Sequence, residues 1–85
     1  MRDFNDSEGR RWSAFVREEP GTDYKGRYYL VMRPEDGAGE EELELVDVRW
    51  NSERTAGRTL TTMSVVELRR RLRQAVGRRA QPVSR

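Results

Sequence analysis

The strictest constraint in this sequence is an alternation of side-chain type between residues 24 and 33. Tyr28, Leu30 and Met32 share one parity, and the other is occupied by Arg27, Tyr29, Val31 and Arg33. Successive side chains of a β-strand point to opposite faces of a sheet. The alternation therefore predicts a strand over 24–33 with one apolar face.

Three further segments are expected to join this strand. Residues 11–17 alternate in the same way and place three side chains on the apolar face: Trp12, Ala14 and Val16. Residues 42–50 predict another strand, but its apolar parity changes between Leu45 and Val46. A β-bulge at that point, or burial on both faces, would explain the change. The threonine-rich segment 58–63 is the fourth expected strand.

The C-terminal part carries a strong helix signal. Ser64 and Glu67 have the spacing of a capping box, in which the serine hydroxyl accepts a hydrogen bond from the backbone amide three residues on. Five apolar side chains then fall within an arc of about 100° of the helix: Val65, Leu68, Leu72, Ala75 and Val76. Gly77 would cap the end. We predict a helix over 65–76 that lies on the apolar face of the strands.

Together these segments predict one α+β domain over residues 1–77, followed by a flexible basic tail over 78–85. The expected fold is a curved antiparallel sheet of three to four strands with one C-terminal helix packed on it. Eighty-five residues suffice for one such domain. The alternative is a small barrel of the SH3 or Tudor kind with the same helix appended. The choice depends on whether the segment 58–63 closes the sheet.

The chain contains neither cysteine nor histidine. Disulfides, thiolate metal sites and the commonest general acid–base residue are therefore excluded. We expect no catalytic residues, no metal and no cofactor, and therefore a binding protein rather than an enzyme. No apolar run has the length of a membrane span, and the first residues lack the apolar core of a signal peptide. A cytoplasmic, bacterial-type protein without a membrane partner is the expectation.

Charge is divided along the chain. Residues 1–47 hold thirteen acids and seven bases, a net charge of −6, whereas residues 48–85 hold ten arginines and two glutamates, a net charge of +8. A one-sided basic segment is typical of proteins that bind anionic partners. The acids between residues 35 and 44 are expected to form a solvated hairpin loop.

The first candidate site is the sheet face opposite the helix. It would carry Phe15 and Tyr29 together with Arg17, Arg27 and Arg33. Aromatic side chains on a sheet can stack nucleic-acid bases while guanidinium groups hold phosphates. Alternatively, the aromatic side chains form a small second core or a cross-strand pair that stabilises the strands.

The second candidate site is an arginine pair on the helix. Glu67 can pair with the arginines three and four residues further on, whereas Arg69 and Arg73 have no acid at helical spacing. Two unpaired guanidinium groups on one flank can hold a phosphate or a carboxylate. Arg78 and Arg79 would strengthen the positive field. The alternative is a solvated surface, or salt bridges to the acidic half of the chain.

The segment Phe4–Trp12 reads Phe-Asn-Asp-Ser-Glu-Gly-Arg-Arg-Trp. It resembles the opening of small uncharacterised bacterial proteins, in which Phe-x-Asp-Ser-x-Gly-Arg-x-Trp leads into a first strand. Asp6 to Gly9 has the composition of a tight turn. The resemblance implies no activity, cofactor or partner.

The sequence therefore leaves two hypotheses about function. One is a nucleic-acid-binding accessory or regulatory protein that uses the two candidate sites. The other is a protein–protein adapter or a self-assembling module, in which the acidic half of one molecule meets the basic half of another and an exposed strand edge contributes. An acidic protein and a second copy, forming a homodimer, are the candidate partners in that case.

Overall fold

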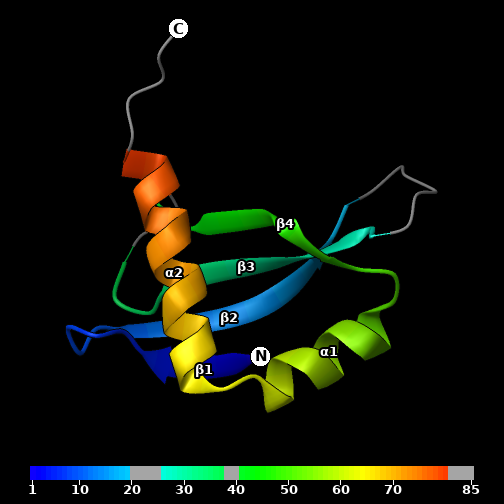
Figure 1. Cartoon of the computed structure of the whole chain (residues 1–85), viewed down its shortest axis with the longest axis horizontal. Coiled ribbons are helices and arrows are strands. Elements are labelled where there is room, and N and C mark those ends of the chain that lie inside the picture. Colours follow the sequence, from blue (N-terminus) through cyan, green and yellow to red (C-terminus); the bar gives the residue numbers. More distant parts are fainter. Residues whose placement is uncertain (20–25, 38–40, 81–85) are drawn as a thin grey trace, which may run out of the picture.

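The computed structural model describes residues 1–19, 26–37 and 41–80, which form an antiparallel sheet with two helices on one face (Figure 1). The elements are β1 (Arg2–Asn5), β2 (Arg11–Glu18), β3 (Tyr28–Pro34), β4 (Leu43–Trp50), α1 (Glu53–Thr62) and α2 (Val65–Ala80). The strand order is β1-β2-β3-β4. The sheet is open, because β1 and β4 occupy its two edges. The α+β prediction is confirmed, the barrel alternative is wrong, and the described part has two helices rather than one.

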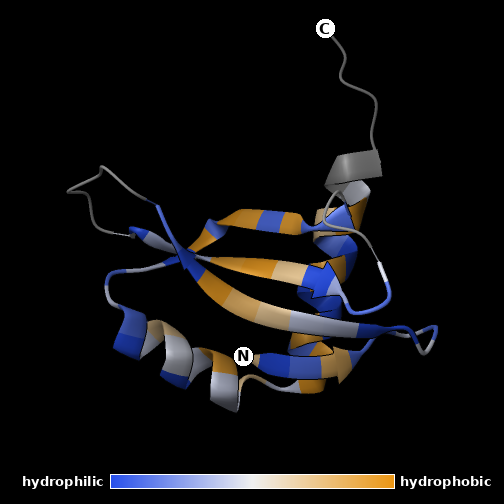
Figure 2. Ribbon diagram, turned by 180° about the vertical axis from the view of Figure 1, so that it is seen from behind, coloured by the Kyte–Doolittle hydropathy of each residue, from blue (hydrophilic) through white to orange (hydrophobic). Residues whose placement is uncertain are grey.

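One face of the sheet carries the hydrophobic core. It consists of Phe4, Trp12, Ala14, Leu30, Met32, Leu43, Leu45 and Val48 from the strands, packed against Leu60 of α1 and Leu68, Leu72 and Ala75 of α2. Figure 2 shows the sheet from the side away from the helices, with apolar residues running along its central strands. The alternation thus placed most core residues correctly. However, Tyr28 is only half-buried and Val76 is 44% exposed, although both were predicted to lie in the core.

The predicted strand over 58–63 is wrong, because residues 58–62 belong to α1. Ser52 caps this helix: its hydroxyl accepts a hydrogen bond from the Thr55 amide at 3.2 Å. Ala56 and Leu60 lie four residues apart and are both buried, which gives the helix an apolar side. Burial of that side outweighs the low helix propensity of threonine, which costs only tenths of a kcal/mol per residue, about 0.7 at most.

The first strand, β1, was not predicted from the sequence. Phe4 of β1 pairs with Trp12 of β2 and is 4% exposed. In a four-residue strand with one buried apolar side chain, alternation cannot be detected.

The start of β1 is anchored to α1 by Arg2. The Arg2 guanidinium donates hydrogen bonds to the carbonyls of Thr61 and Met63, each at 2.9 Å. These carbonyls lie at the C-terminal end of α1, where a cation is stabilised by the helix dipole.

The change of parity in the third expected strand, for which a bulge or burial on both faces was expected, coincides with a shift of register between β3 and β4. Leu45 pairs with Leu30 of β3, whereas Arg49 pairs with the preceding residue, Tyr29. Residues 46–48 therefore have no counterpart on β3. Inserted residues change which parity faces the core, and Val48 is consequently buried on the same face as Leu45.

α2 begins as predicted and ends later. The Glu67 amide donates to the Ser64 hydroxyl at 3.1 Å, as a serine cap requires. The helix continues through Gly77 to Ala80, so this glycine is not the cap. Residues 81–85 of the predicted tail, and residues 24–25 of the predicted strand, lie outside the described residues. Within the described ranges, neither helix combines the length and the apolar composition that crossing a membrane requires.

Candidate functional site

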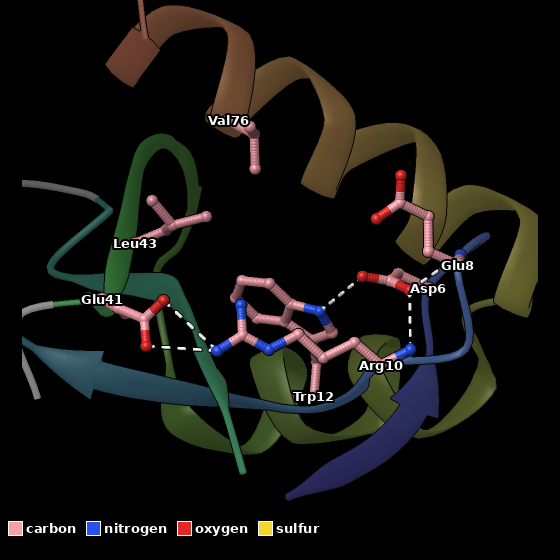
Figure 3. Close-up of a pocket in the computed structure, with 7 residues that line it drawn as sticks. All are labelled: Asp6, Glu8, Arg10, Trp12, Glu41, Leu43 and Val76. Atoms are coloured by element: carbon pink, nitrogen blue, oxygen red, sulfur yellow. Dashed lines mark hydrogen bonds and ion pairs between the residues drawn. The ribbon is translucent and has the colours of Figure 1, made fainter. Parts of the chain in front are cut away.

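Asp6 organises the turn between β1 and β2 (Figure 3). Its Oδ1 accepts hydrogen bonds from the amides of Glu8 and Arg10, both at 2.9 Å, and its Oδ2 accepts one from the Trp12 indole at 2.9 Å. Burial raises the pKa of Asp6, but these hydrogen bonds outweigh it and hold the pKa below the ordinary 3.8. Gly9 adopts a φ of 86°, which favours glycine. The nine-residue pattern therefore has a structural explanation: it builds a turn and docks a tryptophan.

A pocket of about 500 Å³ opens between this turn and the C-terminal half of α2 (Figure 3). Its lining consists of Asp6, Glu8, Arg10, Trp12, Glu41, Leu43 and Val76. The Arg10 guanidinium forms ion pairs with Asp36 at 2.8 Å and with Glu41 at 3.1 Å. It also lies 5.5 Å from the centroid of the Trp12 ring. None of these residues was predicted as a site residue, although the pattern over 4–12 contains four of them.

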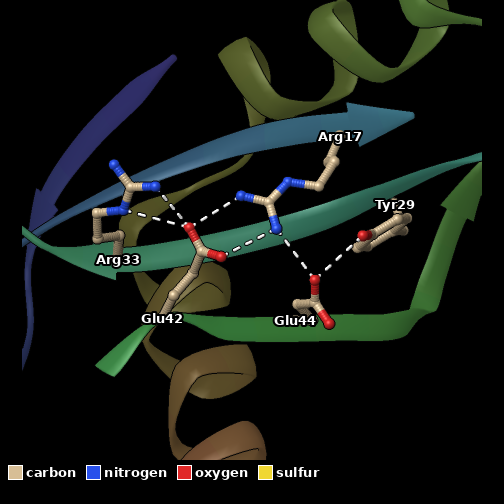
Figure 4. Close-up of polar contacts among 5 residues, drawn as sticks. All are labelled: Arg17, Tyr29, Arg33, Glu42 and Glu44. Carbon is tan, nitrogen blue, oxygen red and sulfur yellow. Dashed lines mark hydrogen bonds and ion pairs between the residues drawn. The ribbon is translucent and has the colours of Figure 1, made fainter. Parts of the chain in front are cut away.

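The first candidate site maps to the sheet face away from the helices (Figure 4). The register pairs Phe15 with Val31 and Arg17 with Tyr29, so these side chains share one face with Arg33. Arg27 precedes β3 and forms an ion pair with Glu18 of β2 at 3.3 Å. Sequence analysis therefore assigned four of the five residues to the correct face of the sheet. It did not predict which side chains cover them.

Two carboxylates of the β4 region occupy this face. Arg17 forms ion pairs with Glu42 at 2.9 Å and with Glu44 at 3.0 Å, and Arg33 contacts Glu42 at 2.7 Å. The Tyr29 hydroxyl donates to Glu44 at 3.2 Å. Sequence analysis placed both acids in the expected strand over 42–50 and also counted them among the solvated acids of the hairpin loop, but it did not predict their ion pairs with arginines. Glu42 and Glu44 alternate with buried leucines, and this spacing was the available signal that they face the arginines.

On this face, the contact between Arg17 and Glu42 stabilises the charged forms of both side chains. Hydrogen bonds from Arg17, assisted by those from Arg33, hold the pKa of Glu42 below its ordinary 4.5 despite partial burial. The same contact with Glu42 raises the pKa of Arg17. The charges of the two arginines are therefore balanced within the protein.

The aromatic rings on this face are covered too. Tyr29 is 8% exposed, and the Arg49 guanidinium lies 5.3 Å from its ring centroid. The guanidinium groups of Arg17 and Arg33 lie 5.6 and 5.4 Å from the centroid of Phe15, which is half-buried. A base that stacked on either ring would have to displace these groups. The geometry favours the alternative of a small second core that stabilises the strands.

The arginines of the helices are placed differently. Arg69 donates a hydrogen bond to the Asn5 carbonyl at 2.8 Å, which does not neutralise its charge. Arg73 is exposed, and its side chain has no partner within the described residues. Arg78 and Arg79 belong to the last turn of α2.

Sequence analysis missed two arginines of α1. Arg54 and Arg58 are exposed, lie four residues apart, and make no side-chain contact with another charged group in the described part of the chain. They point away from the side that carries Ala56 and Leu60, because residues two positions away on a helix lie on opposite sides. They were missed because this segment was predicted as a loop and a strand.

The division of charge along the chain becomes a division between layers. Residues 1–50, which include the four strands, hold thirteen acids and eight bases, a net charge of −5. Residues 51–80, which include both helices, hold eight arginines and two glutamates, a net charge of +6. Figure 1 shows the two helices together on one side of the sheet.

Comparisons with protein-family models, with curated proteins and with solved structures find no match to this chain. Among the described residues, no three acidic, histidine or cysteine side chains come together as metal ligands.

Proposed function

We propose that this chain is a small non-enzymatic binding protein whose helical layer holds the phosphate backbone of a nucleic acid. The observation that carries the proposal is the exposure of Arg54, Arg58 and Arg73, whose side chains have no partner within the described residues. By contrast, Arg17 and Arg33 on the sheet face are bound to carboxylates.

The difference matters energetically. A phosphate that approached Arg17 or Arg33 would compete with Glu42 and Glu44 for the same donors. At Arg54, Arg58 and Arg73 no carboxylate of the described residues competes, so neutralising phosphates there would release their counterions and favour binding. Interactions with phosphates position a protein without reading sequence. We therefore expect weak sequence preference and an accessory or regulatory role.

The test is a fluorescence-anisotropy titration with short labelled single- and double-stranded oligonucleotides over a series of salt concentrations. We expect the Arg54→Gln/Arg58→Gln double variant to bind more weakly than the unchanged protein. Its plot of log affinity against log salt for duplex DNA should be shallower by about 0.9 for each phosphate that the variant no longer neutralises. Arg73→Gln should have a smaller effect in the same direction.

Arg33→Gln is the matched control, because it removes one arginine charge from the sheet face. We expect it to leave the affinity nearly unchanged. If Arg33→Gln weakened binding as much as the helix variants do, the sheet face would be the binding surface instead. Failure of the unchanged protein to bind either oligonucleotide at low salt would overturn the proposal.

The second candidate function is a protein–protein adapter or a self-assembling module. The opposite charges of the sheet layer and the helical layer favour it, because complementary surfaces attract at low ionic strength. Light scattering at two ionic strengths tests self-assembly. A mass that rises at low salt supports it, and a monomer at both salt concentrations rules it out.

A further inference from the structure

We propose that the pocket between the β1–β2 turn and α2 binds a lysine or arginine side chain presented by a separate partner protein (Figure 3). This inference does not depend on nucleic-acid binding. It uses none of the helix arginines, and its ligand carries the opposite charge.

The charge of the pocket selects a cation. Three carboxylates line it, from Asp6, Glu8 and Glu41, against one guanidinium, from Arg10. Arg10 is already engaged by Glu41 and by Asp36, at 3.1 and 2.8 Å. An incoming anion would therefore find the Arg10 guanidinium occupied and would meet the carboxylate of Glu8, which has no partner within the described residues.

Glu8 is the group most available to a ligand. Its side chain is exposed and has no hydrogen-bond or ion-pair partner within the described residues. Figure 3 shows its carboxylate beside α2, whereas that of Glu41 lies across the pocket near Leu43. A cation that entered between them would gain a partner without breaking an existing interaction of Glu8.

The walls of the pocket suit the stem of a long basic side chain. Trp12 and Leu43 are 5% and 6% exposed and form an apolar floor, and Val76 of α2 is 44% exposed. Lysine and arginine bury their methylene stems against apolar surface while the charged end stays near water. The position of the Arg10 guanidinium over the Trp12 ring is the geometry by which tryptophan attracts cations.

A second copy of this chain is a poorer occupant than a separate protein. The unpartnered arginines of the described residues lie on the helical layer, whereas the pocket lies at the end of the sheet. A closed two-fold dimer would require the helical layer of each copy to reach the end of the sheet of the other. We therefore assign the pocket to a separate partner.

The experiment follows Trp12 fluorescence in a Trp50→Phe variant, in which Trp12 is the one remaining tryptophan. The probe is a short blocked peptide with a single arginine, and its control replaces the arginine by citrulline, which has the same shape without the charge. We expect the arginine peptide to change the fluorescence saturably and the citrulline peptide to bind much more weakly. Equal effects of the two peptides, or no change at millimolar arginine peptide, would overturn the proposal.

Two variants of Glu8 localise the binding. Because Glu8 is exposed and unpartnered within the described residues, Glu8→Gln leaves the fold intact and should weaken the arginine peptide about two- to fivefold, as expected for a partly exposed ion pair. Glu8→Lys should weaken it further. Glu53→Gln removes an exposed acid at the start of α1 and should have no effect. Equal affinities of the Glu8 variants and the unchanged protein would contradict the assignment. A change of Trp12 fluorescence with protein concentration alone would identify a second copy as the occupant, and would likewise overturn it.

Discussion

At the scale of single residues, Glu42 decides the character of the outer sheet face. Its side chain is 15% exposed and accepts hydrogen bonds from Arg17 and Arg33 at once. One carboxylate thereby fixes two guanidinium groups over Phe15, and the charges of Arg17 and Arg33 are balanced within the protein.

Replacing Glu42 by glutamine should destabilise the protein at neutral pH. The variant keeps the side-chain volume but loses the negative charge that both guanidinium groups contact, so we expect a loss of about 1–2 kcal/mol in the free energy of unfolding. The pKa of Glu42 is lower in the folded protein than its ordinary 4.5. Its contribution is therefore fully present above that value and is lost as the pH falls through the lowered folded pKa.

Urea unfolding of both proteins at pH 7 and at about pH 3 measures this. The difference in unfolding free energy between the unchanged protein and Glu42→Gln should be smaller at the lower pH. A difference that did not change with pH would mean that the ionised carboxylate is not the stabilising species.

At the scale of secondary-structure elements, sequence predicts what repeats and misses what does not. β2, β3 and β4 each contain enough alternating residues to be found, and the bulge in β4 follows from the change of parity. α1 was missed because its threonines favour strands and only Ala56 and Leu60 mark its buried side. β1 was missed because Phe4 is its single buried residue. The covered state of the candidate sheet face was missed for another reason: it depends on which acids of a neighbouring strand cross over to the arginines.

Replacement by alanine should have opposite effects on stability at Gly57 in α1 and at Gly9 in the β1–β2 turn. Gly57 lies inside α1, and an added Cβ would meet nothing within 4 Å. Gly57→Ala should therefore stabilise the protein by about 0.5–1 kcal/mol. Gly9 also has free space, but its φ of +86° is unfavourable for alanine. Gly9→Ala should destabilise by about 1–2 kcal/mol. Thermal unfolding measures both, and a destabilising Gly57→Ala would contradict the position of this residue within a helix.

At the scale of the whole molecule, Arg2 joins the N-terminal strand to the segment between the two helices. It lies in the edge strand β1, and its guanidinium binds carbonyls at the C-terminal end of α1. At this point the chain turns and continues into α2 (Figure 1). The edge of the sheet and the corner between the helices are therefore held by one side chain that is 59 and 61 residues away from its partners.

Replacing Arg2 by methionine should loosen this corner. The variant keeps the stem but not the hydrogen bonds or the charge at the helix terminus, so we expect a destabilisation of about 1–2 kcal/mol. Hydrogen exchange should accelerate in α1 more than in the middle of α2. Arg11→Met is the control: this arginine is 56% exposed and has ion pairs only at 3.6 Å among the described residues. Its replacement should change stability by less than about 0.5 kcal/mol. Equal effects of the two variants would show that Arg2 does not hold the corner.

The interruption of β4 has a consequence for how this molecule meets its neighbours. Extending a sheet by a foreign strand requires a long, regular row of free backbone groups at an edge. One edge here is β1, with four residues, and the other is β4, whose regular pairing with β3 stops at residues 46–48. A strand added to either edge would find few consecutive hydrogen bonds. Both edges are therefore poor templates for edge-to-edge aggregation, and this protection comes from the backbone itself.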